Sequence, residues 1–439
     1  MSLKVIEILG SGGFGVVERV EAPDGEQYAR KRFSVAQPLS ADMVDNVRKR
    51  FVREASLQSG MQHKNIVPIL AHDLTQEEPW YLMPIAISTL DKDVSDGIID
   101  SSSLLKVVSD IAAGLHEMHQ MEMFHRDLKP QNVLRFSDSD GERYYSISDF
   151  GFVSLSDSRL STLTHTGMAK GTDYYTAPEI TRDLRRARAW TDIYSLGCII
   201  HDVIGSEDRI PCAEIKEQGP YSALLRNCTR ANEKKRFKSV AAVRDVLASI
   251  DVDLPPASDQ AAVDLIQALD DTDLNKSIVQ ELVDFCEDNE DTYDGGLIFR
   301  RLTIENIIKI FELSEIDGNQ IGTMFATWVG EGDFNFEYCD VLAERIQAFF
   351  NEGDLNLRAD CLMALLEMGV RHNRWYVEEK FKRLTGPEMD EALAKRVSVE
   401  IRAIGDDFCN LIERFEGSIG TSRKEFHPII VSTLNDLCS

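Results

Sequence analysis

Three glycines near the N-terminus could bring backbone amides against a phosphate. They are Gly10, Gly12 and Gly15, in the run GSGGFGVV that ends at Val17. Because glycine has no side chain, such a loop lets backbone N–H groups approach nucleotide phosphates. The flanking segments have β-strand character, which favours a loop between two strands over a dinucleotide-binding loop between a strand and a helix. Alone the motif is weak, since a hairpin turn also needs glycine.

Two charged residues follow the glycines at positions that suggest a common task. Lys31 lies in the strand-like segment YARKRF, and Glu54 lies in the helix-like segment FVREA. A lysine that grips the α- and β-phosphates of a nucleotide must itself be held by a carboxylate. Taken singly, each residue would more often be a solvated surface charge, so their order and spacing carry the inference.

The strongest motif is HRDLKPQN, from His125 to Asn132. Its match to fixed residues is too long to arise by chance in one chain. Asp149-Phe150-Gly151 comes next, directly after the strand-like run YYSIS. Ala177-Pro178-Glu179 then closes a segment rich in serine and threonine.

These motifs, in this order, resemble the eukaryotic-type serine/threonine protein kinase family, and the bacterial members look most similar. The resemblance covers residues 1–250. It implies an α+β fold with two lobes, a β-rich N-lobe over about 1–86 and a helical C-lobe over about 87–250. It also implies that ATP and Mg²⁺ bind in the cleft between the lobes.

The resemblance assigns the catalytic roles residue by residue. Asp127 would orient the substrate hydroxyl and accept its proton, and Lys129 would neutralise the γ-phosphate. Asn132 and Asp149 would hold Mg²⁺. Lys31, held by Glu54, would grip the other phosphates.

The same resemblance places the adenine between apolar residues and a hinge. Val17 and Ala29 would form the roof and Leu134 the floor. The gatekeeper and the hinge that follows it would be Met83, Pro84, Ile85 and Ala86.

Two features concern substrate and regulation. Lysine at 129, rather than the alanine-arginine pattern of tyrosine kinases, indicates Ser/Thr acceptors in a protein substrate. Thr164 and Thr166 resemble the phosphorylated T-x-T of bacterial kinases, so autophosphorylation there is expected. Because Arg126 could bind a phosphothreonine by charge-assisted hydrogen bonds, the modification would order the loop.

Structural roles also follow from the resemblance. Asp192 should hold the catalytic loop, and Glu179 should form a buried ion pair with Arg236. Gln58 departs from the family, which has an apolar residue four positions after the glutamate of the helix. This departure predicts that the helix carrying Glu54 is less firmly seated.

The elements that must position these residues change type along the chain. Strand-like runs occupy residues 4–33, a helical pattern covers 41–59, and strand-like runs return over 66–87. Beyond residue 100 the pattern is mainly helical. The segment DVDLPPASD, residues 251–259, cannot continue a helix and is interpreted as a linker.

Residues 260–439 predict an acidic, all-helical domain, either an α-solenoid with repeat-like stacking or a helical bundle. The expected helices are 260–270, 274–288, 303–316, 336–351, 355–370, 374–384, 387–404, 406–416 and 426–437. Of the net charge of −26, about −22 falls in residues 251–439. Such acidity argues against nucleic acid or an anionic membrane as a partner. A contact with the basic run Arg182, Arg185, Arg186 and Arg188 is expected instead.

The composition indicates the cellular compartment of the chain. The eight cysteines form no C-x-x-C pair and do not cluster with histidine, so they are expected to be free thiols in a reducing, cytoplasmic compartment. No apolar stretch approaches the length of a membrane helix. A kinase-fold scaffold with little activity and a small-molecule phosphotransferase are the alternative functions. The oligomeric state is left open.

Overall fold

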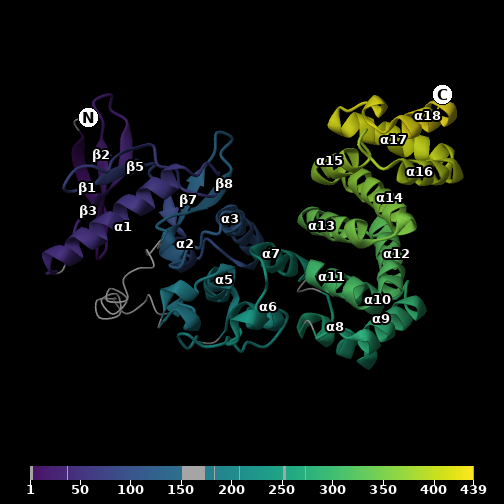
Figure 1. The fold of residues 1–439 in the computed structure, drawn as a ribbon, viewed down its shortest axis with the longest axis horizontal. Helices are drawn as coiled ribbons and strands as arrows, with labels where there is room; N and C mark the ends of the chain where they lie inside the picture. The colour runs from purple at the N-terminus through teal and green to yellow at the C-terminus, as the bar shows by residue number, and fades with distance from the viewer. Residues whose placement is uncertain are drawn as a thin grey trace. The chain divides into compact units, whose positions relative to one another are not determined.

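The computed structural model describes residues 3–36, 38–150, 174–181, 183–206, 208–250, 254–271 and 273–438. The chain divides into two compact units, Met1–Leu247 and Ala248–Ser439 (Figure 1). The first unit is α+β, and every regular element described in the second unit is a helix. Among the described helices, none combines the length and the apolar character needed to cross a membrane.

The N-terminal part of the first unit is an antiparallel sheet in the order β1-β2-β3-β5-β4. Its strands are β1 (Lys4–Ser11), β2 (Gly15–Glu21), β3 (Gln27–Phe33), β4 (Ala71–Asp73) and β5 (Trp80–Met83). The first three form the expected meander. The glycine-rich loop joins β1 to β2, so it connects two strands as its sequence context indicated.

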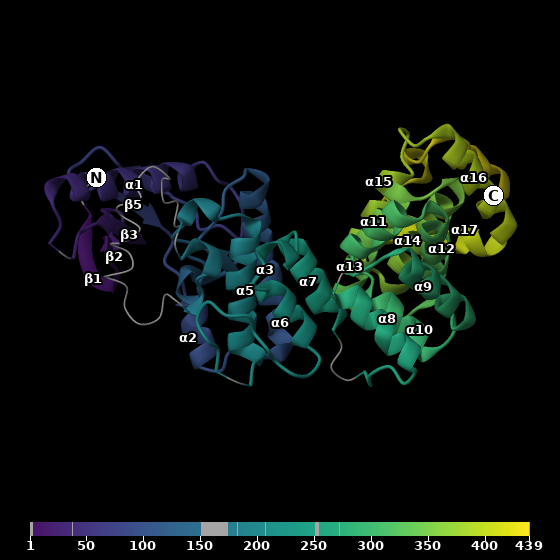
Figure 2. The ribbon, with the colours of Figure 1, turned by 60° about the horizontal axis from the view of Figure 1, so that its bottom comes forward.

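Helix α1 (Ala41–Ser59) lies beside this sheet (Figures 1 and 2). It packs on the sheet through one stripe of apolar side chains. Phe51 on that stripe lies between two aromatic rings, with centroids 5.9 Å from Phe33 and 5.5 Å from Tyr81. The apolar spacing that predicted this helix therefore also determines which face is buried. Glu54 lies on the same helix, so the packing of Phe51 also determines how far Glu54 lies from the sheet.

The rest of the first unit is mainly helical. Its helices are α2 (Leu90–Ser95), α3 (Ser101–Gln120), α5 (Ala189–Ile204), α6 (Ser222–Thr229) and α7 (Val240–Ser249). A small sheet in the order β6-β7-β8 lies with them, formed by β6 (Ser88–Thr89), β7 (Val133–Ser137) and β8 (Arg143–Ile147). Helices α5 and α6 approach closely at Gly197, where a Cβ would lie 2.4 Å from the Cβ of Cys228.

The second unit is a stack of helices that follow one another from α8 to α18 (Figure 1). They are α8 (Gln260–Asp271), α9 (Lys276–Asp288), α10 (Tyr293–Arg301), α11 (Ile304–Leu313), α12 (Glu315–Glu331), α13 (Phe336–Glu352), α14 (Leu355–His372), α15 (Trp375–Leu384), α16 (Glu391–Ile404), α17 (Asp406–Ile419) and α18 (Pro428–Leu437). From α11 onward, each helix contacts the second one after it, as α12 contacts α14 and α16 contacts α18. This regular stacking is solenoid-like.

Two expectations about these helices are wrong. The single helix expected over 303–316 is divided at Ser314, which ends α11 and caps α12 by accepting a hydrogen bond from the Asp317 amide. Helices α10 and α12 were not expected. Helix α12 is buried on several sides, including Gly318, Gly322 and Gly330, so its sequence lacks a single apolar stripe.

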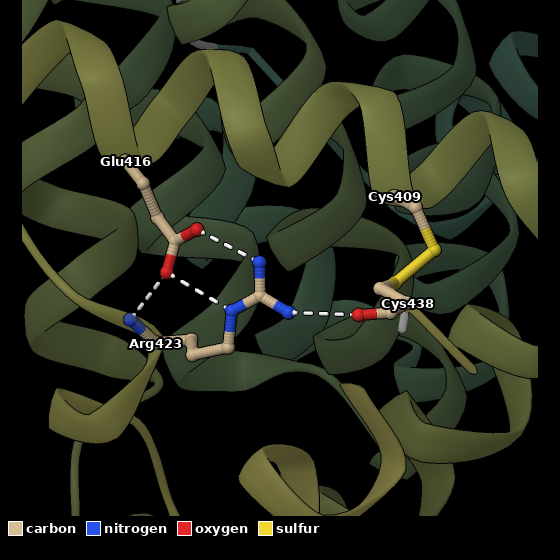
Figure 3. Close-up of a disulfide and its surroundings, with 4 residues drawn as sticks. All are labelled: Cys409, Glu416, Arg423 and Cys438. Carbon is tan, nitrogen blue, oxygen red and sulfur yellow. Dashed lines mark hydrogen bonds and ion pairs between the residues drawn. A yellow bond between two sulfur atoms is a disulfide. The ribbon is translucent and has the colours of Figure 1, made fainter. Parts of the chain in front are cut away.

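The expectation that all eight cysteines are free thiols is also wrong. Cys409 of α17 forms a disulfide with Cys438, which follows α18, with Cα atoms 5.4 Å apart (Figure 3). Arg423 supports this corner: its side chain pairs with Glu416, and Nη1 donates to the carbonyl oxygen of Cys438 at 3.3 Å. Spacing could not reveal the pairing, because the two cysteines are 29 residues apart and carry no recognisable motif.

Candidate functional site

One cleft in the first unit gathers most of the residues singled out by sequence. Its volume is about 510 Å³, within the range of small-molecule sites. The glycine loop lines one side and the catalytic loop lines another. The lining includes Gly10, Gly12, Gly15, Val17, Lys31, Glu54, Asp127, Lys129, Asn132, Asp149 and Phe150.

The catalytic loop holds three polar side chains against one another. Lys129 Nζ donates to Asp127 Oδ2 at 2.8 Å. Asn132 Nδ2 donates to the carbonyl oxygen of Asp127 at 2.8 Å and to its Oδ2 at 3.2 Å. A short 3₁₀ turn, Pro130–Asn132, brings Asn132 back toward Asp127. The Asp127 carboxylate is therefore oriented from two directions while its edge faces the cleft.

A buried aspartate fixes the backbone of this loop. The Asp192 carboxylate accepts hydrogen bonds from the amides of His125 at 2.9 Å and Arg126 at 2.8 Å. Arg126 has a φ of 68°, a left-handed conformation that is unfavourable for its side chain. Burial opposes the charge of Asp192, but the hydrogen bond to His119 and the charge of that histidine hold its pKa below the usual range. The expected role of Asp192 therefore has a direct geometric basis.

His125 links the catalytic loop to the segment that carries Asp149. Its Nε2 lies 3.0 Å from the carbonyl oxygen of Ser148, and its ring meets that of Phe150 edge to face. Burial lowers the pKa of His125 and so favours the neutral ring. Asp149 also adopts a positive φ, of 57°. Sequence reasoning missed Ser148, although it directly precedes Asp149, and His119, for which no motif gives a signal.

The pairing of Lys31 differs from the expected one. Lys31 Nζ forms an ion pair with Asp149, and no ion pair joins Lys31 to Glu54 among the described residues. Burial disfavours the charge of Lys31, but Asp149 raises its pKa. Lys31 in turn lowers the pKa of Asp149 against the effect of burial. Burial raises the pKa of Glu54 to about 7, because nearby Lys31 compensates only part of its charge.

Gln58 is not an unsatisfied polar group in the helix. Its side chain is only 3% exposed, and Nε2 donates to the carbonyl oxygen of Val67 at 2.7 Å. The amide therefore ties α1 to the segment preceding β4. A specific hydrogen bond thus takes the place of the apolar contact expected at this position.

The glycine loop and the predicted adenine pocket lie on the same sheet. Gly12 donates its amide to the carbonyl oxygen of Gly15 at 2.8 Å, which closes the turn. A Cβ on Gly15 would lie 3.3 Å from Cε of Lys31, so glycine leaves room for the lysine. One apolar cluster contains Ala29 and Met83, with Val17, Ile85, Ala86 and Leu134 packed against it. Pro84 directly follows β5.

Other expected features lie further from the cleft. Glu179 and Arg236 form a buried pair with two N–O distances of 2.9 Å, as expected. The phosphosite candidates Thr164 and Thr166 lie outside the described residues. No cluster of three potential metal-ligating side chains occurs within the described part of the chain. Asn132 and Asp149 nevertheless line one cleft with oxygen atoms of the kind that Mg²⁺ prefers, so the site fits that ion.

Comparisons with known proteins agree with this geometry. Serine/threonine-protein kinase PknJ of Mycobacterium tuberculosis is 30% identical over 206 residues, which cover 46% of this chain and 34% of that protein. A probable cell division protein kinase of Encephalitozoon cuniculi is 29% identical over 211 residues, 48% of this chain and 74% of that protein. Cyclin-dependent kinase 8 of Drosophila melanogaster is 26% identical over 234 residues, covering 48% of this chain and 49% of its own.

The chain spans about a third of the length of the mycobacterial kinases that it matches. The model of the protein kinase domain matches residues 3–284, more than half of the sequence. That match includes the glycine loop, the catalytic loop and the buried Glu179–Arg236 pair described above. The chain therefore belongs to the protein kinase domain family.

Proposed function

We propose that this chain is an active serine/threonine protein kinase that transfers the γ-phosphate of ATP to protein hydroxyls. The observation that carries the proposal is the convergence of Asp127, Lys129, Asn132 and Asp149 on one cleft that also receives Lys31. These are the groups needed to place a hydroxyl in line and to compensate charge on phosphate oxygens.

Each side chain has a separate task in this reaction. Asp127, held by Lys129 and Asn132, orients the acceptor hydroxyl and takes its proton. Lys129 compensates charge on the transferred phosphoryl group, and Lys31 compensates charge on the phosphates that remain. Mg²⁺, when bound by Asn132 and Asp149, would supply additional compensation of phosphate charge. The hydrogen bond from Gly12 to Gly15 closes the glycine loop, whose other backbone amides would approach the phosphates.

The test uses the full chain with radiolabelled ATP and a generic protein substrate. Wild type should transfer label to serine or threonine, and Asp127→Asn should not. Asp183→Asn, a change at a partly exposed aspartate away from the cleft, should leave transfer unchanged. Absence of transfer by the wild type would favour a scaffold. Label found only on small molecules would favour the phosphotransferase alternative.

We further propose autophosphorylation at Thr164 and Thr166. The support is the T-x-T pattern together with Arg126, whose backbone is fixed by Asp192. A phosphothreonine carries nearly two negative charges, which a nearby guanidinium can bind. Mass spectrometry of ATP-treated wild type should find both sites. Thr164→Ala/Thr166→Ala should activate more slowly than wild type, and full activity in this variant would refute the regulatory role.

We also propose that the acidic helical domain regulates access to the kinase or recruits its substrate. Tethering raises the effective concentration of the domain to about the millimolar range. Two arginines of the basic run already have partners, because Arg185 pairs with Asp183 and Arg186 with Glu233, and this weakens the electrostatic attraction. The rates of fragment 1–255 and of the full chain on one peptide should differ most at low salt. Identical salt dependence would eliminate the contact.

A further inference from the structure

A groove in the second unit combines apolar walls with an acidic rim. Its volume is about 440 Å³. Tyr293, Leu297, Trp328 and Phe334 contribute the apolar surface. Two aromatic rings hold the ring of Trp328 in place: its centroid lies 5.6 Å from that of Phe299 and 4.9 Å from that of Phe334. The hydroxyl of Tyr293 donates to the carbonyl oxygen of Pro255 at 2.6 Å, so this ring is also oriented.

The groove exposes an unused hydrogen-bond donor. No described residue accepts a hydrogen bond from the indole nitrogen of Trp328. A Cβ built on Gly296 of α10 would lie 3.4 Å from this nitrogen. Glycine at 296 therefore leaves the indole N–H open to the groove, where a backbone carbonyl of a bound peptide could accept it.

The rim carries more negative charge than its one basic residue balances. Glu290, Asp291 and Glu331 line the groove and form no ion pair with any described residue. A fourth acid, Asp333, lies 3.1 Å from His372 Nε2.

Arg300, the one basic residue among the described lining residues, lies over two aromatic rings, 5.0 Å from the centroid of Tyr338 and 5.9 Å from that of Phe334. Of these two rings only Phe334 lines the groove, so one aromatic ring of the groove already lies beside a guanidinium. The negative charge of the unpaired acids is therefore not compensated within the groove, and a further cation would compensate it.

We propose that this groove docks an extended protein segment through an arginine side chain. A planar guanidinium can stack on the aromatic wall while its N–H groups reach the carboxylates of Glu290, Asp291 or Glu331. The backbone carbonyl next to that arginine receives the Trp328 N–H. This inference rests on the proposed kinase function only in assigning the segment to a substrate or regulator of the enzyme.

The test measures binding without ATP, so it is independent of catalysis. The probes are fluorescent nonapeptides with degenerate flanks and a central residue fixed as arginine, as citrulline or as glutamate. Citrulline keeps the shape of arginine but removes its charge. Fluorescence anisotropy with the full chain should show about five-fold tighter binding of the arginine set than of the citrulline set. The glutamate set should bind most weakly.

Two groove variants and one matched control locate the site. Glu290→Gln/Asp291→Asn/Glu331→Gln should remove the preference for arginine. The control, Asp284→Asn/Glu287→Gln/Asp288→Asn, makes the same change in net charge on exposed acids that do not line the groove, and should retain it. Gly296→Leu fills the groove and keeps all the acids, and it should also abolish binding while circular dichroism shows an unchanged helical signal.

The outcomes are decisive in either direction. Equal binding of the arginine and citrulline sets, or no binding of either, would overturn the proposal. An equal loss in the control and groove variants would also overturn it, because that result indicates non-specific attraction to an acidic surface. Phosphoryl transfer is measured separately on the wild-type chain. Absence of docking by a wild type that transfers phosphate normally contradicts only this inference, and docking by a wild type that transfers no phosphate contradicts only the proposed kinase activity.

Discussion

The two units of this chain use charged residues in different ways. In the first unit, buried charges are paired and fix backbone geometry, as Asp192 does for the catalytic loop and Arg236 does for Glu179. The second unit also has buried charges with partners, such as Asp294, which accepts the Asp259 amide, and Lys380, which pairs with Glu344, but its acids Glu290 and Asp291 are exposed and form no ion pair with a described residue. This difference matches the two proposals made above, because catalysis requires fixed charges whereas a docking groove keeps its charges available for a partner.

The largest expected effect concerns the charges in the cleft. Lys31→Met and Asp149→Ala should each lower kcat by about 10³-fold, because each removes compensation of charge on the phosphates or metal. The unfolding temperature should change little, since both residues line a cleft rather than the core. Single-turnover phosphoryl transfer and calorimetry provide the two readouts. If either variant retained phosphoryl transfer, the catalytic role assigned to these fixed charges would be wrong.

The buried carboxylate of Asp192 should matter for folding as well as activity. Asp192→Asn replaces an acceptor of three hydrogen bonds with an amide, so unfolding in urea should require about 3 kcal/mol less. Hydrogen exchange should locate the loss in the first unit. The control Asp183→Asn, at a surface ion pair, should change stability by less than about 0.5 kcal/mol. Equal effects of the two changes would contradict the role of the buried charge.

The stability of the second unit should depend on its disulfide. Cys409→Ser/Cys438→Ser opens a loop with a sequence separation of 29 residues, and about 2–4 kcal/mol of stability should be lost. Hydrogen exchange should increase in α17 and α18 and remain unchanged in α1. Cys212→Ser, at a cysteine of the first unit that is not part of a disulfide, serves as control. A reducing agent that lowers wild-type stability no more than it lowers that of the double variant would show that the disulfide is not formed.

The smallest expected effect is a dependence on pH at Glu54. Its pKa is raised from 4.5 to about 7, so the folded state holds the proton more tightly than the unfolded state. The resulting stabilisation is complete below pH 4.5 and is lost as pH rises through about 7.

Glu54→Gln cannot ionise, so its stability relative to wild type should increase from pH 4.5 to about pH 7, measured as a shift in Tm. Glu388→Gln, at an exposed glutamate, should show no such trend. A constant difference between Glu54→Gln and wild type would place the pKa of Glu54 outside this range.

Sequence predicted the parts of the first unit in which motif and periodicity agree. The strands around the glycine loop and the helix over 41–59 were expected and are present, because alternation and helical spacing are local signals. The partner of Lys31 could not be predicted in the same way. Glu54 and Asp149 both lie near the lysine, so the choice between them depends on tertiary geometry and on what fills the cleft.

In the second unit, local signals predicted the amphipathic helices but not the buried helix α12 or the Cys409–Cys438 pair. A helix buried on several sides has no contrast between faces, and a disulfide depends on contacts distant in sequence. The groove beside Trp328 was missed for the same reason. Its residues come from several helices and loops, and none carries a motif.

The left-handed backbone of Arg126 has a consequence for protein engineering. A side chain such as arginine in this conformation costs about 1 kcal/mol relative to residues that adopt it readily. A screen that selects only for thermal stability should therefore enrich Arg126→Asn or Arg126→Gly. A screen for phosphoryl transfer should reject both, because they remove the guanidinium expected to bind the phosphorylated loop. Directed evolution should therefore replace Arg126 under selection for stability and retain it under selection for phosphoryl transfer.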